Sequence, residues 1–102
     1  MKAIAMYFVG PDGLPWQERS IAANEETMPL VVEGREVTVF FRSDTAGDLT
    51  ILVDVVGDGE FEVYVVRPST TKEFITIDEH FHGVKLRFST AAVVTAKYHS
   101  AP

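Results

Sequence analysis

The sequence feature that most constrains the fold is an alternation of apolar and polar residues between Val37 and Val66. A period of two is typical of β-strands with one buried face. The alternation runs through three consecutive stretches, which are separated by the segments 43–48 and 57–59. Both segments contain aspartate and glycine, which favour turns. We therefore expect three antiparallel strands joined by two tight turns.

The second turn predicts a register for the hairpin around it. Residues that lie opposite each other in a hairpin share a face, so apolar residues before the turn must pair with apolar residues after it. A three-residue loop at 57–59 allows this, with Gly59 in the left-handed conformation that glycine adopts without strain. The predicted pairs are Val55 with Phe61, Val53 with Val63 and Ile51 with Val65.

In this register, Phe40, Leu52 and Tyr64 lie on the outer face of the predicted sheet. Single exposed apolar residues are normal on protein surfaces. The alternative is that a neighbouring segment or another subunit covers them. Two further aromatic residues, Trp16 and Phe74, complete a candidate oligomer or partner interface made of all five side chains.

The segment 10–30 has no regular period, and Pro15 interrupts it. We predict a long loop or extended arm that carries Trp16. The alternative is that Trp16 tucks against the core, because tryptophan is highly buried on average.

The remaining chain has further stretches with the character of strands. Together with the three described above they give about eight strands, at a spacing typical of sandwiches and barrels. We predict a single all-β domain over residues 1–102. Two sheets with an apolar layer between them favour an antiparallel β-sandwich, of which the jelly roll is one form, over a closed barrel. The further predicted strands are 2–9, 29–32, 73–77, 84–89 and 92–99.

The amino-acid composition argues against several classes of binding partner and cofactor. The net charge of −6 over 102 residues disfavours electrostatic binding to nucleic acid or anionic lipid. The absence of cysteine excludes disulfides and thiolate metal sites. No apolar run approaches the roughly 20 residues of a membrane helix, and the first ten residues do not form a signal peptide. We expect no cofactor.

Three histidines form the first candidate metal site. His80 and His82 would point the same way from an extended segment, and His99 could supply a third ligand to a divalent metal. The favoured alternative is that these are solvated loop histidines.

Asp54, Asp58 and Glu60 surround the glycine turn and form a second candidate, a calcium site. Their spacing does not match that of a calcium-binding loop. Turn formation by Asp58 and solvation of the other two carboxylates are the favoured explanation.

No catalytic motif is present: the sequence lacks G-x-S-x-G, H-E-x-x-H and a phosphate-binding glycine loop. We therefore predict a protein that is not an enzyme. A small β-rich enzyme that uses His80, His82 or His99 is the remaining catalytic hypothesis.

Residues 36–99 resemble small β-sandwich proteins encoded among phage structural genes. The resemblance lies in the turn SD-x-AG-x-L at 43–49 and in the strand GV-x-LRF at 83–88. It implies an accessory protein of the virion, such as a head decoration or tail-associated protein. Such proteins are often trimers and bind a protein lattice through a loop or arm, here residues 10–30.

Two functions follow as hypotheses. The first is a structural or interaction protein, such as a capsid decoration protein that binds and stabilises a lattice of virion proteins. The alternative is a carbohydrate-binding, lectin-like module. That function needs coplanar exposed aromatic rings, or a calcium site, at a loop edge.

Overall fold

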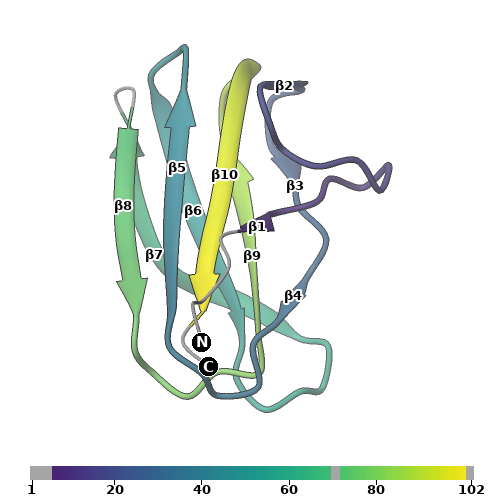
Figure 1. Cartoon of the computed structure of the whole chain (residues 1–102), viewed down its shortest axis with the longest axis vertical. Coiled ribbons are helices and arrows are strands. Elements are labelled where there is room, and N and C mark those ends of the chain that lie inside the picture. The colour runs from purple at the N-terminus through teal and green to yellow at the C-terminus, as the bar shows by residue number, and fades with distance from the viewer. Residues whose placement is uncertain (1–5, 70–71, 101–102) are drawn as a thin grey trace.

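The computed structural model describes residues 6–69 and 72–100, and these residues form two antiparallel β-sheets packed face to face (Figure 1). The predicted all-β sandwich is confirmed, with ten strands in the described part of the chain. They are β1 (Met6–Tyr7), β2 (Arg19–Ile21), β3 (Glu25–Glu26), β4 (Leu30–Val31), β5 (Val37–Ser43), β6 (Gly47–Asp54), β7 (Phe61–Ser69), β8 (Lys72–Ile77), β9 (Gly83–Phe88) and β10 (Ala92–Ser100).

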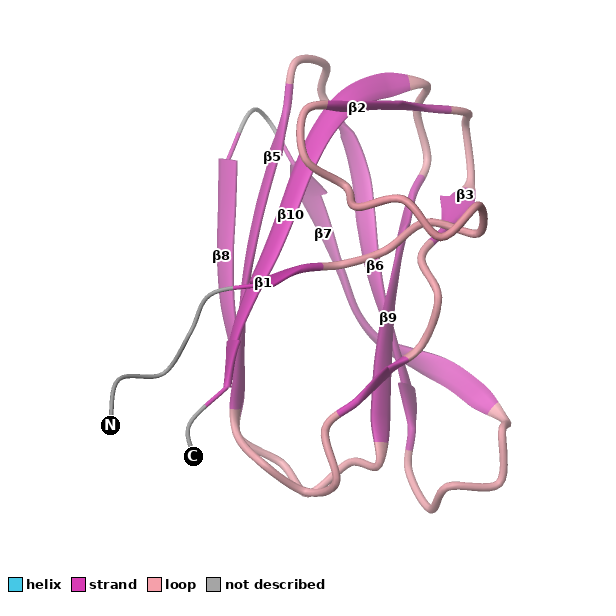
Figure 2. Ribbon diagram, turned by 45° about the vertical axis from the view of Figure 1, so that its right-hand side comes forward, coloured by secondary structure: helices cyan, strands magenta, loops and turns pink. Residues whose placement is uncertain are grey.

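The first sheet has the strand order β1-β10-β5-β8, and β2 also pairs with β10. The second sheet has the order β3-β9-β6-β7, and β4 also pairs with β9. Figure 2 shows the two layers, with β8, β5 and β10 in one and β7, β6 and β9 in the other. The described residues include no helix that is long and apolar enough to cross a membrane.

The first predicted turn joins the two sheets instead of two neighbouring strands. β5 pairs with β10 and β8, whereas β6 pairs with β9 and β7. Both strands bury their odd-numbered residues in the same core, as the alternation predicts. Alternation shows which face of a strand is buried, but it does not show which strand lies beside it.

The core lies between the two inner faces. The rings of Phe41 and Phe88, from opposite sheets, have centroids 4.9 Å apart. Burial of each large apolar side chain stabilises the fold by roughly 1.5–3 kcal/mol. The predicted inward faces of β8, β9 and the first part of β10 are confirmed. Their buried residues are Ile75, Ile77, Val84, Leu86, Phe88, Val94 and Ala96.

The predicted register of the second hairpin is correct only far from the turn. Ile51 lies opposite Val65 as predicted, but the pairing then shifts by one residue, so that Leu52 lies opposite Val63. The predicted pairs Val53–Val63 and Val55–Phe61 are therefore wrong. The shift is a β-bulge, which reverses the faces of the residues beyond it.

The bulge moves Tyr64 inward and Val63 outward. Tyr64 packs against the core, and its ring lies 5.2 Å from that of Phe81. Val63 is exposed, and Phe61 is half-buried beneath the ammonium group of Lys85, which lies 4.6 Å from the ring centroid. The predicted burial of Phe61 and Val63, and the predicted exposure of Tyr64, are therefore wrong.

Asp54 explains why the hairpin loop is longer than predicted. Its side chain is buried and accepts hydrogen bonds from the backbone N–H groups of Gly57, at 2.9 Å, and Gly59, at 3.1 Å. Both glycines have φ near +83°, which glycine adopts without strain. The Asp54 carboxylate thus organises residues 55–60. The prediction that this carboxylate is simply solvated is wrong.

Asp54 is expected to make stability depend on pH. Burial raises the pKa of Asp54, but the backbone hydrogen bonds from Gly57, Gly59 and Asp58, with a smaller effect of His82, lower it below 3.8 overall. A lowered pKa in the folded state stabilises the protein above pH 3.8, and this contribution is lost as the pH falls through the folded-state pKa.

We expect Asp54→Asn to lower the melting temperature by about 5 °C at pH 7, because an amide cannot accept both hydrogen bonds. Thermal unfolding followed by circular dichroism at pH 7 and at pH 3 measures the difference between the variant and the parent. The difference should shrink at pH 3. An equal difference at the two pH values would show that the ionised carboxylate does not hold the loop.

Residues 10–30, predicted as a long loop or extended arm, are packed along the sandwich. They include β2 and β3, and Trp16 is 0% exposed within the core. Glu26 on β3 forms ion pairs with Lys85, at 2.8 Å, and with Arg87, at 3.2 Å, both on β9. The alternative interpretation, that Trp16 tucks against the core, is confirmed.

Two predicted boundaries need correction. β7 continues to Ser69, so the polar loop predicted to begin at Arg67 starts later, and residues 70–71 lie outside the described residues. Residues 2–5 of the predicted strand 2–9 also lie outside them. The described part of that segment contains β1 and the buried Phe8.

Candidate functional site: the outer face of the first sheet

The five residues of the candidate interface have different positions in the fold. Trp16 is in the core, Leu52 is 7% exposed, and Tyr64 packs against the core. Burial, reinforced by the nearby Glu79, raises the pKa of Tyr64. Only Phe40 and Phe74 lie together on an outer surface, that of the first sheet.

This surface, the outer face of the first sheet, is built by alternation in β5, β8 and β10. Each strand buries every second residue in the core for most of its length and directs the others outward. The outward residues are Thr38, Phe40 and Arg42 on β5, Lys72, Phe74 and Thr76 on β8, and Val93, Thr95, Lys97 and His99 on β10.

One line of outward residues crosses the sheet at right angles to the strands. Tyr7 lies opposite Lys97, Lys97 lies opposite Phe40, and Phe40 lies opposite Phe74. We call these four side chains the aromatic row. The Lys97 ammonium group lies 5.4 Å from the centroid of the Tyr7 ring, and the Phe40 and Phe74 rings meet edge to face at 6.3 Å. The row thus offers apolar surface on both sides of one positive charge.

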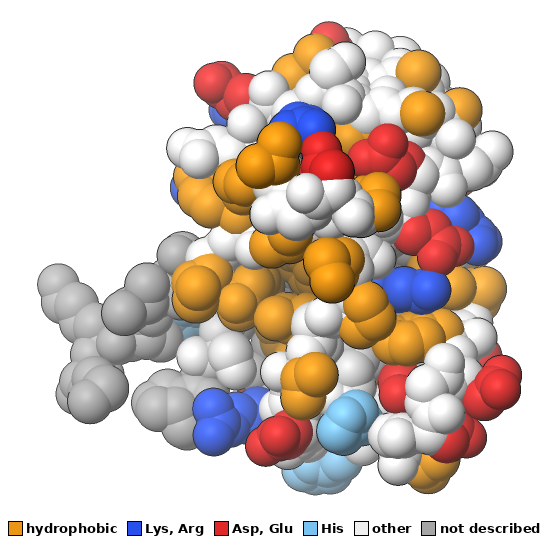
Figure 3. All heavy atoms as spheres, turned by 90° about the vertical axis from the view of Figure 1, so that its right-hand side faces the viewer, with side chains coloured by type: hydrophobic (Ala, Val, Ile, Leu, Met, Phe, Trp, Pro, Cys, Tyr) orange, Lys and Arg blue, Asp and Glu red, His pale blue; other side chains and the backbone are white. Residues whose placement is uncertain are grey.

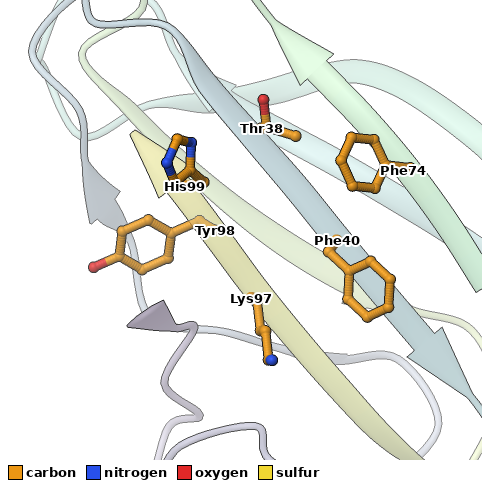
Figure 4. Close-up of a pocket in the computed structure, with 6 residues that line it drawn as sticks. All are labelled: Thr38, Phe40, Phe74, Lys97, Tyr98 and His99. Atoms are coloured by element: carbon orange, nitrogen blue, oxygen red, sulfur yellow. The ribbon is translucent and has the colours of Figure 1, made fainter. Parts of the chain in front are cut away.

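The surface is hollowed around this row. One hollow, of about 280 Å³, is lined by Phe40, Phe74 and Lys97 (Figure 4). Its lining also includes Thr38 on β5 and His99 near the end of β10. Phe74 is 68% exposed, so most of its ring is accessible to a ligand.

A second hollow, of about 310 Å³, shares Phe40 and Lys97 with the first and extends it toward Tyr7 and Arg42. We call the two together the groove. Gln17 and Glu18 form its rim, where the backbone N–H of Glu18 donates a hydrogen bond of 2.9 Å to the Thr95 hydroxyl. The packed segment after Trp16 therefore supplies one wall of the groove.

Exposed apolar residues also lie at the edge of the sandwich that carries the segment 10–36. Figure 3 shows this edge, where hydrophobic side chains lie among acidic and basic ones. Exposed apolar residues in the segment 10–36 include Leu14, Met28 and Val31.

The three histidines do not come together. Within residues 6–69 and 72–100, no group of three or more His, Cys, Asp or Glu side chains is placed to hold a metal ion. His80 Nδ1 lies 3.0 Å from the carbonyl oxygen of Gly34, His82 lies against Gly57, and His99 lines the groove. The shared metal site considered for them is not supported.

Comparison with known proteins gives the fold and no family. No protein-family model matches the chain, and no curated protein matches its sequence. The solved structure of the SPBc2 prophage-derived protein YomS superimposes with a TM-score of 0.68 at 14% identity, covering 98% of this chain and 94% of that one.

Carbohydrate-binding modules of family 29 share the fold more distantly. A mutant of CBM29-2 gives a TM-score of 0.51 at 14% identity, covering 97% of this chain and 92% of that chain. A second mutant of a family 29 module gives 0.50 at 15% identity, with the same coverage. At such low identity these likenesses show the fold alone.

Sequence reasoning identified Phe40 and Phe74 but missed Tyr7 and Lys97. Both appeared in runs with the character of strands, as outward or unassigned residues. Only the pairing of β1 with β10, and of β10 with β5, places them beside Phe40. Strand order, which the sequence does not encode locally, was the missing signal.

Proposed function

We propose that this chain is a non-enzymatic accessory protein of a phage particle that binds another protein of the particle. The observation that carries the proposal is its likeness in fold, over nearly the whole length of both chains, to a prophage-derived protein. The motifs at 43–49 and 83–88, which resemble those of phage structural proteins, add support.

The side of the molecule formed by segment 10–36 is the proposed attachment surface. Leu14, Met28 and Val31 are each about half exposed there. The segment is held to the sandwich by Trp16 and Glu26, so these apolar side chains are presented on a fixed support. Attachment through a preformed surface avoids the entropy cost of ordering a free arm.

Analysis of purified particles tests this function. Particles from a strain that carries the gene, banded on a density gradient, should contain the protein at a fixed ratio to a major structural protein when measured by mass spectrometry. Light scattering of the purified protein should give three times the monomer mass if the trimer that the phage resemblance implies forms without other particle proteins. Absence of the protein from intact particles would contradict the proposal.

The groove supports a second candidate, a carbohydrate-binding module. The observation in its favour is the aromatic row, because flat aromatic faces and flanking polar groups bind ligands that have both apolar and polar faces. The shared fold with family 29 carbohydrate-binding modules is consistent with it. The Phe40 and Phe74 rings are inclined at 75°, so a sugar would pack on one ring at a time instead of on a coplanar pair.

Affinity electrophoresis in gels that contain soluble polysaccharides tests the second candidate. Retarded migration in at least one polysaccharide, relative to an inert reference protein, is the expected result. Unchanged migration in a broad set of neutral and acidic polymers would reject carbohydrate binding and would leave the particle-bound function to be judged separately.

A further inference from the structure

The outer face of the first sheet is basic, although the chain as a whole is acidic. The sequence has 9 Lys and Arg residues against 15 Asp and Glu residues. The outward residues of β5, β8 and β10 nevertheless include Arg42, Lys72 and Lys97 and no carboxylate. At the rim of this surface, Glu18 lines the groove and Asp44 lines a neighbouring hollow.

The positive charges on this surface are weakly neutralised. Elsewhere, Arg19, Arg67, Lys85 and Arg87 each pair with a carboxylate. Among the described residues, Lys72 and Lys97 form no ion pair, and Arg42 reaches only Glu18, at 3.9 Å. Both partners of that pair are more than half exposed, so the interaction is weak and easily exchanged for a ligand.

Lys97 places a positive charge in the middle of the aromatic row. Lys97 lies between Tyr7 on β1 and Phe40 on β5, so a ligand that contacts both rings must pass over its ammonium group. Three strand spacings separate β1 from β8, roughly 14 Å, which is long enough for a short oligosaccharide. Thr38 and Thr76, whose hydroxyls lie 3.2 Å apart, offer neutral hydrogen-bonding groups next to Phe74.

We propose that the groove binds an acidic glycan, with sugar rings packed on Tyr7, Phe40 and Phe74 and an acidic substituent bound by Lys97 and Arg42. This inference rests on the carbohydrate-binding function proposed above. Charge complementarity selects an acidic over a neutral polymer, because Lys97 gains a charge-assisted hydrogen bond and Arg42 exchanges its weak pair with Glu18 for one. The groove is lined by two cations, Lys97 and Arg42, whereas nucleic-acid binding needs larger clusters of Lys and Arg.

Matched polymers test the inference. Polygalacturonate and its carboxyl-reduced form share a backbone and differ in charge, and heparin, which is also a chain of sugar rings, provides sulfate. Binding is measured by isothermal titration calorimetry at low and physiological salt, with oligothymidylate as the nucleic-acid control. We expect at least one acidic polymer to bind about tenfold or more tightly than the neutral polymer, and salt to weaken this binding.

A pair of charge variants tests the residues. Lys97→Gln should weaken binding of the acidic polymer about tenfold. Arg35→Gln, which removes an exposed charge outside the groove, should leave binding unchanged. Circular dichroism of both variants verifies that the fold is retained.

Each contrary outcome has a distinct meaning. Equal binding of charged and neutral polymers would overturn the acidic preference while the carbohydrate-binding function stands. Binding of none of the polymers would overturn both. Equally tight binding of oligothymidylate would show that the surface binds polyanions in general. An unchanged affinity of the Lys97→Gln variant would show that the acidic polymer does not bind in the groove.

Discussion

Replacing Trp16 with alanine is expected to lower the free energy of unfolding by about 3–5 kcal/mol. The indole is completely buried in the core, so truncation leaves a large cavity. The backbone around it is also tied to the first sheet: the Trp16 N–H donates to the carbonyl of Phe8 and the Ala96 N–H donates to that of Trp16, both at 2.8 Å. Urea unfolding followed by circular dichroism measures the loss.

Two companion variants sharpen this prediction. Trp16→Phe should cost much less than the alanine variant, because it keeps most of the apolar volume and removes an indole N–H that has no hydrogen-bond partner among the described residues. Leu14→Ala, in the same segment but half exposed, should change stability by less than about 0.5 kcal/mol. If Trp16→Ala cost less than about 1 kcal/mol, the segment 10–30 would be a loose arm in solution.

Replacing both Phe40 and Phe74 with alanine is expected to weaken glycan binding by at least about thirtyfold, which shifts a micromolar dissociation constant to tens of micromolar or weaker. The two rings form the apolar floor of one end of the groove and support each other edge to face. Phe74 is mostly exposed, so its removal should cost little stability. Calorimetric titration with the best polymer measures the affinity.

Val63 and Val66 provide the matched control for the aromatic variants. Both are about half exposed on β7, in the second sheet, and neither lines the groove. The double variant Val63→Ala, Val66→Ala should bind as the parent does. Equal losses in the two double variants would mean that ligand binding is not confined to the first sheet.

Regular alternation allowed much of the fold to be predicted from the sequence. In β8 and β9, every second side chain points into the core as predicted, because no bulge shifts the register of either strand against β5 or β6. Patterning of this kind is a local property of a strand.

The errors arose where local patterning does not decide the structure. The bulge at Tyr64 reverses one strand face, and the Asp54 carboxylate replaces a tight turn by a longer, side-chain-organised loop. Trp16 is drawn into the core from a segment that has no period at all. Each case depends on contacts between residues whose spatial proximity the sequence does not show.

The candidate site was only half predictable for the same reason. Phe40 and Phe74 could be identified from the sequence as apolar residues on polar strand faces. Lys97 and Tyr7 could be assigned to the site only once strand order placed them beside Phe40. The two proposed functions rest on different observations: the phage-particle role on the likeness in fold, and carbohydrate binding on the aromatic row and the groove of the first sheet.

The most direct test of the central claim is a titration of ¹⁵N-labelled protein with oligosaccharides of whichever acidic polymer binds most tightly in calorimetry, followed by two-dimensional NMR of the backbone amides. The account predicts dose-dependent shifts that gather at Phe40, Arg42, Phe74 and Lys97 and spare the outer face of the second sheet. Shifts that gather around β6, β7 and β9, or a spectrum that does not change at millimolar ligand, would contradict the claim that the groove binds an acidic glycan.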